Sequence, residues 1–334
     1  MKKLFIIMIL LLVLCLNIFA FGSSAESKET VITVSHVATE GQVHPFNEFT
    51  DVMQEVLDQE TSGKIKLKVY AGGSLSNNNS EMLTMIKDGL LDMALIDTAP
   101  LSSYEPLMSI FGLPYIFKDL EHVEEVMSGQ VGDIFKEKLE NKGFTILAWL
   151  TGRDFRSVLN SVRPIYKPED LKGLKIRVTE DPVFVDTFKA FGAIPVPTSW
   201  GELHTALQTK TVDAIENGPQ VIADYGFLEF AKYFSLTKHT NMPMVAVISR
   251  DKLNSLGEED KKIMIAAADV ARNAARKLSE KQIEESYARI EEQGGFVNKV
   301  ENLEDFRTVV LPVLEDYKEK LGEEGANLIE LILE

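Results

Sequence analysis

One segment restricts the possible folds of this chain more than any other. Residues 258–293 carry an almost unbroken helical pattern, with three consecutive alanines at 266–268, and the pattern stops at Gly294-Gly295. A helix of this length extends about 50 Å, which is too long for one compact lobe. A coiled-coil arm is the alternative, but apolar residues are not sustained at the a and d positions of a heptad. The segment therefore indicates a fold larger than a single lobe.

The length of the chain agrees with this inference. Its 334 residues, of which 45% are hydrophobic, can bury one large core or two medium ones. Two lobes of about 150 residues are the expectation for such a length.

The first residues have the pattern of a secretory signal peptide, which we assign to residues 1–25. Two lysines precede an apolar run at 4–20, and small residues at 23–25 supply a cleavage site. A permanent membrane anchor is the alternative, because the run is of borderline length for a span. Cys15 raises a lipoprotein alternative, although a leucine precedes it where a lipobox has Gly or Ala. We expect an exported protein that is periplasmic, or extracytoplasmic where the organism has no outer membrane.

Cleavage would change the composition of the chain. The net charge would fall from −16 to −18 because two lysines are lost, and the single cysteine would be lost as well. A strongly acidic protein does not bind nucleic acid through its overall field. An anionic ligand would therefore need local cations.

The first half of the chain alternates between expected strands and helices. The order β-α-β-α-β implies a largely parallel sheet with right-handed crossovers. Residues 106–117 form an unusually apolar connection, which we expect to be buried as core. The expected strands are 29–36, 64–70, 91–96 and 144–150, and the expected helices are 45–59, 80–88 and 119–140.

Ligands of parallel sheets bind beyond the carboxyl ends of the strands. That rule selects His36, the Ala71-Gly72-Gly73 turn and Asp97, with His44 at the start of the next helix. Each of these could equally be an ordinary loop or capping residue. An ionised Asp97 facing a ligand would repel a second carboxylate and accept hydrogen bonds from hydroxyl groups.

Residues 171–218 bring three suitable groups to one edge of a second sheet. Arg177 lies near the end of a strand at 173–178, Trp200 begins a helix at a Ser-x-x-Glu capping box, and Asn217 follows a strand at 211–215. A guanidinium fork matches a carboxylate, an amide can donate to it, and an indole can stack on a sugar ring. We predict that Arg177 binds a carboxylate. The alternative is a surface salt bridge to a neighbouring acidic residue.

Three arginines precede this stretch in an otherwise acidic chain. We expect Arg153 and Arg163 to form surface ion pairs, whereas composition alone leaves the role of Arg156 open.

Several segments resemble one family, the substrate-binding proteins of tripartite ATP-independent periplasmic (TRAP) transporters of the DctP type. The similar segments are GSL at 73–75 through LLDMALID at 90–97, GLPYIF at 112–117, RPIYKPEDLKG at 163–173, LKGLKIRV at 171–178 and FGAIPVPTSWGELHTALQTKTVDAIEN at 191–217. They lie between residues 73 and 217 and follow the family's order.

The resemblance implies a two-lobed fold like that of periplasmic binding proteins, with mostly parallel sheets and a long helix along both lobes. Lobe 1 would comprise residues 26–152 with a return segment at about 242–280, and lobe 2 would comprise 153–241, completed by about 281–334. The implied ligand-binding arginines are Arg177 and Arg156, joined by Trp200 and Asn217.

Three departures from the family pattern concern this site. Asp154-Phe155-Arg156 stands where the family has a Gly-x-Arg context, and Gly218 follows Asn217 where the family has proline. His204 stands where the family has a tyrosine, so the resemblance does not define this part of the pocket wall.

The function that follows is a non-enzymatic carrier. It would capture an organic acid, favoured as a uronate or aldonate, close around it and deliver it to the small and large permease subunits. A C4-dicarboxylate or a keto acid is the alternative ligand, and an ATP-driven importer is the alternative partner. An exported enzyme is the rival class, but the chain has no H-E-x-x-H, G-x-S-x-G or Walker motif. We expect no catalytic residues, no cofactor, no metal, no nucleic acid and a monomer.

Overall fold

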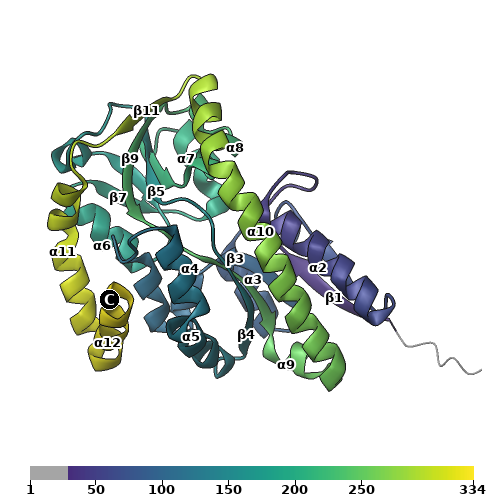
Figure 1. Cartoon of the computed structure of the whole chain (residues 1–334). Helices are drawn as coiled ribbons and strands as arrows, with labels where there is room; N and C mark the ends of the chain where they lie inside the picture. The colour runs from purple at the N-terminus through teal and green to yellow at the C-terminus, as the bar shows by residue number, and fades with distance from the viewer. Residues whose placement is uncertain (1–28) are drawn as a thin grey trace, which may run out of the picture.

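The computed structural model describes residues 29–334, so the predicted signal peptide lies outside the described residues (Figure 1). Two sheets, each flanked by helices, form the two lobes. The sheet of lobe 1 has the strand order β2-β1-β3-β10-β4. Only β10 runs antiparallel to its neighbours. The strands are β1 (Thr30–Ser35), β2 (Ile65–Tyr70), β3 (Met93–Asp97), β4 (Phe144–Leu150) and β10 (Met244–Ser249).

The sheet of lobe 2 has the order β11-β9-β5-β8-β6-β7, in which only β5 is antiparallel to its neighbours. The expectation of two mostly parallel sheets is confirmed. The sequence patterns did not predict β5, β9 or β11. The strands are β5 (Arg156–Asn160), β6 (Lys175–Val178), β7 (Ile194–Pro197), β8 (Ala214–Asn217), β9 (Tyr233–Thr240) and β11 (Phe296–Lys299).

The helix expected at 119–140 is wrong in one respect, because the structure divides it at Gly129, which is extended with φ −98° and ψ −162°. A Cβ on the nearby Gly132 would come within 2.0 Å of the Met127 carbonyl oxygen, so the break brings two backbones closer than a side chain allows.

The main helices are α2 (Pro45–Thr61), α3 (Asn79–Lys87), α4 (Leu120–Ser128), α5 (Gln130–Glu140), α6 (Pro182–Ala190), α7 (Leu203–Gln208), α8 (Pro219–Asp224), α9 (Arg250–Asn254), α10 (Glu258–Glu292), α11 (Leu303–Lys320) and α12 (Gly322–Leu333).

The chain passes between the lobes through residues 151–155, through residues 241–243 and along α10. We call the first two the hinge segments. Figure 1 shows α10 running past both lobes, and it packs on α2 and β4 in lobe 1 and on α8 and β11 in lobe 2. The long-helix expectation is therefore confirmed. The buried face of α10 consists mostly of alanine and serine, and small side chains let both lobes approach the helix closely.

The two hinge segments are tied to each other and to α10. The side-chain amide of Asn241 donates to the Arg153 carbonyl at 2.6 Å. Gly152 has φ +93°, and a Cβ there would lie 3.1 Å from the Arg276 carbonyl oxygen of α10. The first hinge segment thus crosses α10 at Gly152, where both the positive φ and the close approach to the helix favour glycine.

The apolar connection at 106–117 is buried, as expected. Its 3₁₀ turn η2 (Pro106–Gly112) belongs to lobe 1 and packs on α6 of lobe 2, where a Cβ on Gly112 would lie 2.5 Å from a methyl group of Val183. One apolar cluster consequently reaches from lobe 1 into lobe 2 behind the hinge. Within residues 29–334, no helix is long and apolar enough to cross a membrane.

Candidate ligand-binding site

A cavity lies between the two lobes at the carboxyl ends of their parallel strands. The structure brings five of the seven predicted site residues to its wall, namely Asp97, Arg156, Arg177, Trp200 and Asn217. Lobe 1 adds Asn78, Asn79, Ser80 and Pro100, and lobe 2 adds Thr179 and Glu180. The other two predicted residues, His36 and His44, are not on this wall.

Arg177 is held in place by its own lobe. It lies on β6 between the buried Ile176 and Val178, and it is itself only 4% exposed. Its Nε and Nη2 atoms donate to the Thr198 carbonyl at 2.9 and 2.6 Å, and Nη1 has no acceptor among the described residues. Burial lowers the pKa of Arg177 to about 10 against the opposing charge of Glu216, so the guanidinium stays protonated at neutral pH.

Arg156 is held by a different partner, the buried Glu216 of the neighbouring strand β8. Its Nε and Nη2 donate to the two carboxylate oxygens at 2.5 and 2.6 Å, and Nη2 also reaches the Glu216 carbonyl at 2.9 Å. His239 Nε2 lies 3.3 Å from the same carboxylate. Burial alone would raise the pKa of Glu216, but the charge and hydrogen bonds of Arg156, with His239, bring it down to about 2. The Glu216 carboxylate is therefore ionised, and both of its oxygens accept hydrogen bonds from Arg156.

The cations around the cavity differ in whether they have a carboxylate partner. Arg153 Nη1 pairs with Asp97 Oδ1 at 2.9 Å, and Arg156 pairs with Glu216. Among the described residues, Arg177 forms no salt bridge and binds only a neutral carbonyl. The wall thus holds one cation without a bonded counter-charge, with the Glu180 carboxylate also on the wall. The predicted surface pairing of Arg163 is wrong, because its guanidinium donates to the carbonyls of Asp170 and Lys172.

Asn217 and Trp200 are oriented by their neighbours. Asn217 Oδ1 accepts from the Gly218 N–H at 2.9 Å, so its Nδ2 remains as a donor. The Trp200 ring packs edge-on against Tyr225 and Phe227, at centroid distances of 5.0 and 5.9 Å. His204 packs on Phe227 at 4.8 Å and is not on the cavity wall.

The predicted capping box does not form. Ser199 Oγ donates to Glu202 at 2.7 Å, but no side chain caps a backbone N–H at this position. The first turn, Trp200–Glu202, is accordingly a 3₁₀ turn before α7.

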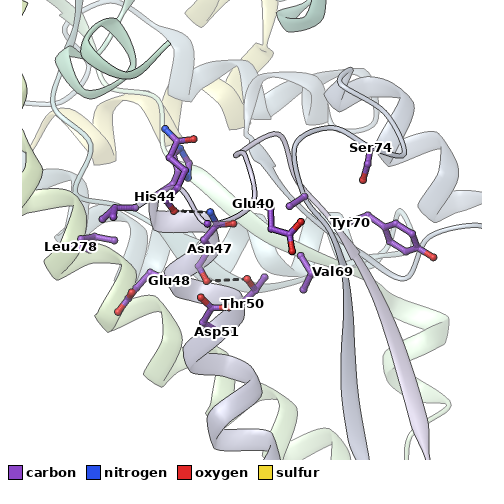
Figure 2. A pocket seen from close by; sticks show the side chains of 14 residues that line it. Glu40, His44, Asn47, Glu48, Thr50, Asp51, Val69, Tyr70, Ser74 and Leu278 are labelled. Atoms are coloured by element: carbon purple, nitrogen blue, oxygen red, sulfur yellow. Dashed lines mark hydrogen bonds between the residues drawn. The ribbon is translucent and has the colours of Figure 1, made fainter. Parts of the chain in front are cut away.

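The two histidines of lobe 1 lie beside Phe46 at the start of α2. His44 caps this helix, because its Nδ1 accepts from the Phe46 N–H at 3.1 Å. His44 also lines a groove with Glu40, Asn47 and Glu48, separate from the interlobe cavity (Figure 2). His36 is fully buried, and both of its ring nitrogens lack hydrogen-bond partners among residues 29–334.

These histidines should make the folded protein sensitive to mild acid. Burial lowers the pKa of His36 from 6.5 to about 4, and burial with the charge of Arg153 lowers that of His44 to about 3. Between pH 6.5 and 4 the unfolded chain therefore binds protons that the folded chain does not. The free energy of unfolding should fall with falling pH, by up to about 1.4 kcal/mol per pH unit for each histidine.

Urea unfolding of the mature protein at pH 7.0 and pH 5.0 would measure this loss. His44→Asn retains a side-chain acceptor for the helix cap and removes one titrating group, so it should reduce the pH dependence. If the parent and the His44→Asn variant lost the same amount of unfolding free energy between pH 7.0 and pH 5.0, this assignment would be contradicted.

Sequence reasoning missed the lobe 1 residues at 78–80 and the partner of Arg156. The loop after β2 ends in Asn77-Asn78-Asn79 before a helix, and the strand-end rule could have selected that loop for its polar side chains. No sequence signal pairs Arg156 with Glu216, because β5 and β8 become neighbours only in the folded sheet.

Comparisons with known proteins agree with this geometry. The family model described as bacterial extracellular solute-binding protein, family 7 (DctP), matches residues 34–320. The 2,3-diketo-L-gulonate-binding periplasmic protein YiaO of Escherichia coli K12 is 36% identical over 241 residues, covering 72% of this chain and 71% of that protein.

Two solved structures have the same overall arrangement. A TRAP periplasmic solute-binding protein of Polaromonas sp. JS666 bound to D-erythronate has a TM-score of 0.86 at 31% identity, covering 91% of this chain and 98% of that one. One from Roseobacter denitrificans with β-D-glucuronate has a TM-score of 0.86 at 29% identity, covering 91% and 99%. This chain therefore belongs to the DctP family, the non-enzymatic periplasmic solute-binding proteins of TRAP transporters.

Proposed function

We propose that this protein captures a sugar acid with a single carboxylate and delivers it to the membrane permease of a TRAP transporter. The observation that carries the proposal is the charge arrangement of the interlobe cavity. Arg153 and Arg156 are each paired with a carboxylate, and Arg177 is not. One ligand carboxylate would give Arg177 a counter-charge, as Asp97 does for Arg153 and Glu216 does for Arg156.

The donors that would hold this carboxylate come from three neighbouring strands of lobe 2. Two hydrogen bonds fix the Arg177 guanidinium and three fix that of Arg156. Both leave Nη1 without a protein acceptor among the described residues, and Asn217 offers Nδ2. A hydrogen bond to a charged group contributes about 1.5–3 kcal/mol. Because all three side chains are buried, they need little reordering when the ligand arrives.

The remainder of the wall suits hydroxyl groups and a ring. Asp97 uses Oδ1 for Arg153, so Oδ2 can accept from a ligand hydroxyl, and Glu180 offers a second carboxylate acceptor. Trp200 presents an aromatic surface of the kind that stacks on sugar rings. The ligands in the related proteins, D-erythronate, β-D-glucuronate and 2,3-diketo-L-gulonate, are acids with further oxygen functions along the carbon chain.

Capture by closure follows from the placement of the cavity. Its wall includes residues of both lobes, so the full set of contacts exists only when the lobes approach each other. A ligand that contacts both lobes shifts the population toward the closed form, with the hinge segments absorbing the motion. In this proposal the closed monomer docks on the small and large permease subunits and releases its cargo there.

A ligand screen on the purified mature chain tests the proposal. The panel would contain D-glucuronate, D-galacturonate, D-erythronate, succinate, malate and pyruvate, with melting temperature followed by titration calorimetry. We expect a sugar acid to raise the melting temperature and bind one site per chain. Tight binding of succinate or malate without any response to sugar acids would favour the C4-dicarboxylate alternative instead, and tight binding of pyruvate alone the keto-acid one.

A further inference from the structure

The three consecutive asparagines between β2 and α3 occupy three different environments. Asn78 caps α3, since its Oδ1 accepts from the Ser80 and Glu81 N–H groups at 2.8 and 3.2 Å. Asn77 contacts lobe 2 across the rim of the cleft, and Asn79 lines the ligand cavity. We call residues 77–79 the asparagine segment.

The asparagine segment is folded on lobe 1 without help from lobe 2. Ser76 Oγ accepts from the Asn78 N–H at 3.0 Å and donates to Glu81 at 2.6 Å. Gly73, at φ +67°, lies so close that a Cβ there would come 2.9 Å from the Asn77 Cβ. The Gly73 N–H donates to the His36 carbonyl at the end of β1. The segment therefore moves with lobe 1 as a preformed unit.

Lobe 2 meets this unit at Gly201, directly after Trp200. A Cβ on Gly201 would lie between 2.4 and 2.6 Å from the amide atoms of the Asn77 side chain, closer than real Cβ contacts occur. Gly201 does not have a positive φ, so other residues could adopt its backbone conformation. The absence of a side chain at 201 thus leaves the space that the Asn77 amide occupies.

Among the described residues, the side-chain oxygen of Asn79 is an acceptor without a donor in the closed cleft. Its Oδ1 is buried and has no hydrogen-bond partner within residues 29–334. A buried acceptor that has lost its water and gained no donor opposes closure. A ligand hydroxyl in the cavity would supply the donor and remove that opposition.

We infer that the asparagine segment is a clasp that couples closure of the lobes to recognition of a ligand hydroxyl. Asn77 fits against Gly201 when the lobes close, and the same movement buries Asn79 Oδ1 against the ligand. Asn77 and Gly201 are positioning residues, and Asn79 discriminates hydroxylated acids from unhydroxylated ones. The part played by Asn79 rests on the proposed function, whereas the contact of Asn77 with Gly201 does not.

The contact can be tested without any ligand. The mature chain has no cysteine once residues 1–25 are removed. An Asn77→Cys/Gly201→Cys variant should form an intramolecular disulfide under mild oxidation, because the unliganded lobes visit the closed form and the two Cβ positions would then be adjacent. Compared with Asn77→Cys/Gly257→Cys, it should show a mobility shift that reductant reverses. Failure to crosslink would overturn the clasp, whatever the ligand screen gives.

Ligand affinity then tests the steric fit. Gly201→Val should raise the Kd for D-glucuronate at least about tenfold through overpacking at the rim. Adding Asn77→Ala should restore most of that loss, since the clash is with the Asn77 side chain. Gly257→Val, where a Cβ meets nothing within 4 Å, is the matched control. A tenfold loss that Asn77→Ala does not repair would overturn the role of the contact.

Discrimination by Asn79 is measured with matched pairs of acids, D-erythronate against butanoate and D-glucuronate against cyclohexanecarboxylate. Asn79→Leu should reduce the preference of the protein for the hydroxylated acid about tenfold, and Asn327→Leu, at an exposed position on α12 away from the cavity, should not. An unchanged preference in Asn79→Leu would overturn the coupling. If the parent protein binds none of these acids, the proposed function fails instead, while the disulfide result still decides the rim contact.

Discussion

Replacing Arg177 with alanine should raise the Kd for the bound acid at least about 30-fold. Loss of one partner from a buried, hydrogen-bonded charge pair costs about 2–5 kcal/mol, and each 1.4 kcal/mol is a factor of ten. Among the described residues, Arg177 binds only the Thr198 carbonyl, so its charge is available for the ligand carboxylate. Arg153 and Arg156 are already paired with carboxylates and cannot take its place as counter-charge. Titration calorimetry with the strongest ligand of the screen would measure the change.

Two further variants separate charge from geometry and from stability. Arg177→Lys keeps the positive charge and loses the fork, so it should bind more weakly than the parent and more tightly than Arg177→Ala. Arg250→Ala removes an exposed arginine that pairs with the adjacent Asp251, and it should bind normally. If Arg177→Ala bound the acid within about threefold of the parent, the carboxylate would have to be held elsewhere.

Glu216→Gln should lower the free energy of unfolding by about 3–5 kcal/mol, the range found when one member of a buried ion pair is removed. Glu216 is fully buried and accepts from two nitrogens of Arg156, with His239 beside it. The amide has nearly the same shape and leaves the buried guanidinium without its counter-charge. Because the pKa of Glu216 lies at about 2, its contribution is present at neutral pH and is lost only in strong acid. Urea unfolding at pH 7 would measure it.

The double variant Arg156→Met/Glu216→Gln distinguishes an unpaired charge from a simple packing defect. Removing the Arg156 guanidinium as well leaves no cation stranded by the loss of Glu216 at this position. The double variant should therefore lose less unfolding free energy than the two single variants added together. Strictly additive losses in unfolding free energy would contradict this explanation.

The sequence predicted most of the lobe 2 residues that line the cavity because these residues follow local rules. Strand β6 alternates, Asp181-Pro182 begins a helix as a cap and first residue should, and Asn217 follows a buried strand. These rules place side chains at the ends of neighbouring parallel strands, and the structure has Arg177, Trp200 and Asn217 there.

What escaped prediction depends on contacts between distant segments. Strand β5 is buried along its whole length, so it shows no alternation, and β11 has only four residues. The helix at 119–140 divides because Gly129 and Gly132 bring two backbones together, which a helical pattern does not reveal. His36 and His44 satisfied the strand-end rule but lie against Phe46, off the cavity wall. The rule selects a sheet edge and does not say which of its residues line the cavity.

The position of β10 in the first sheet has a consequence for how the chain acquires its structure. This strand lies between β3 and β4 but begins at Met244, after the strands β5 to β9 of the other lobe. Until it arrives, β3 and β4 have no partner on their facing edges, and the sheet cannot close from the first 150 residues alone. Pairings so distant in sequence slow folding. Lobe 1 is thus not an independent folding unit. A chain crossing a membrane amino end first would lack the β3-β10-β4 part of its first sheet until most of its length had passed.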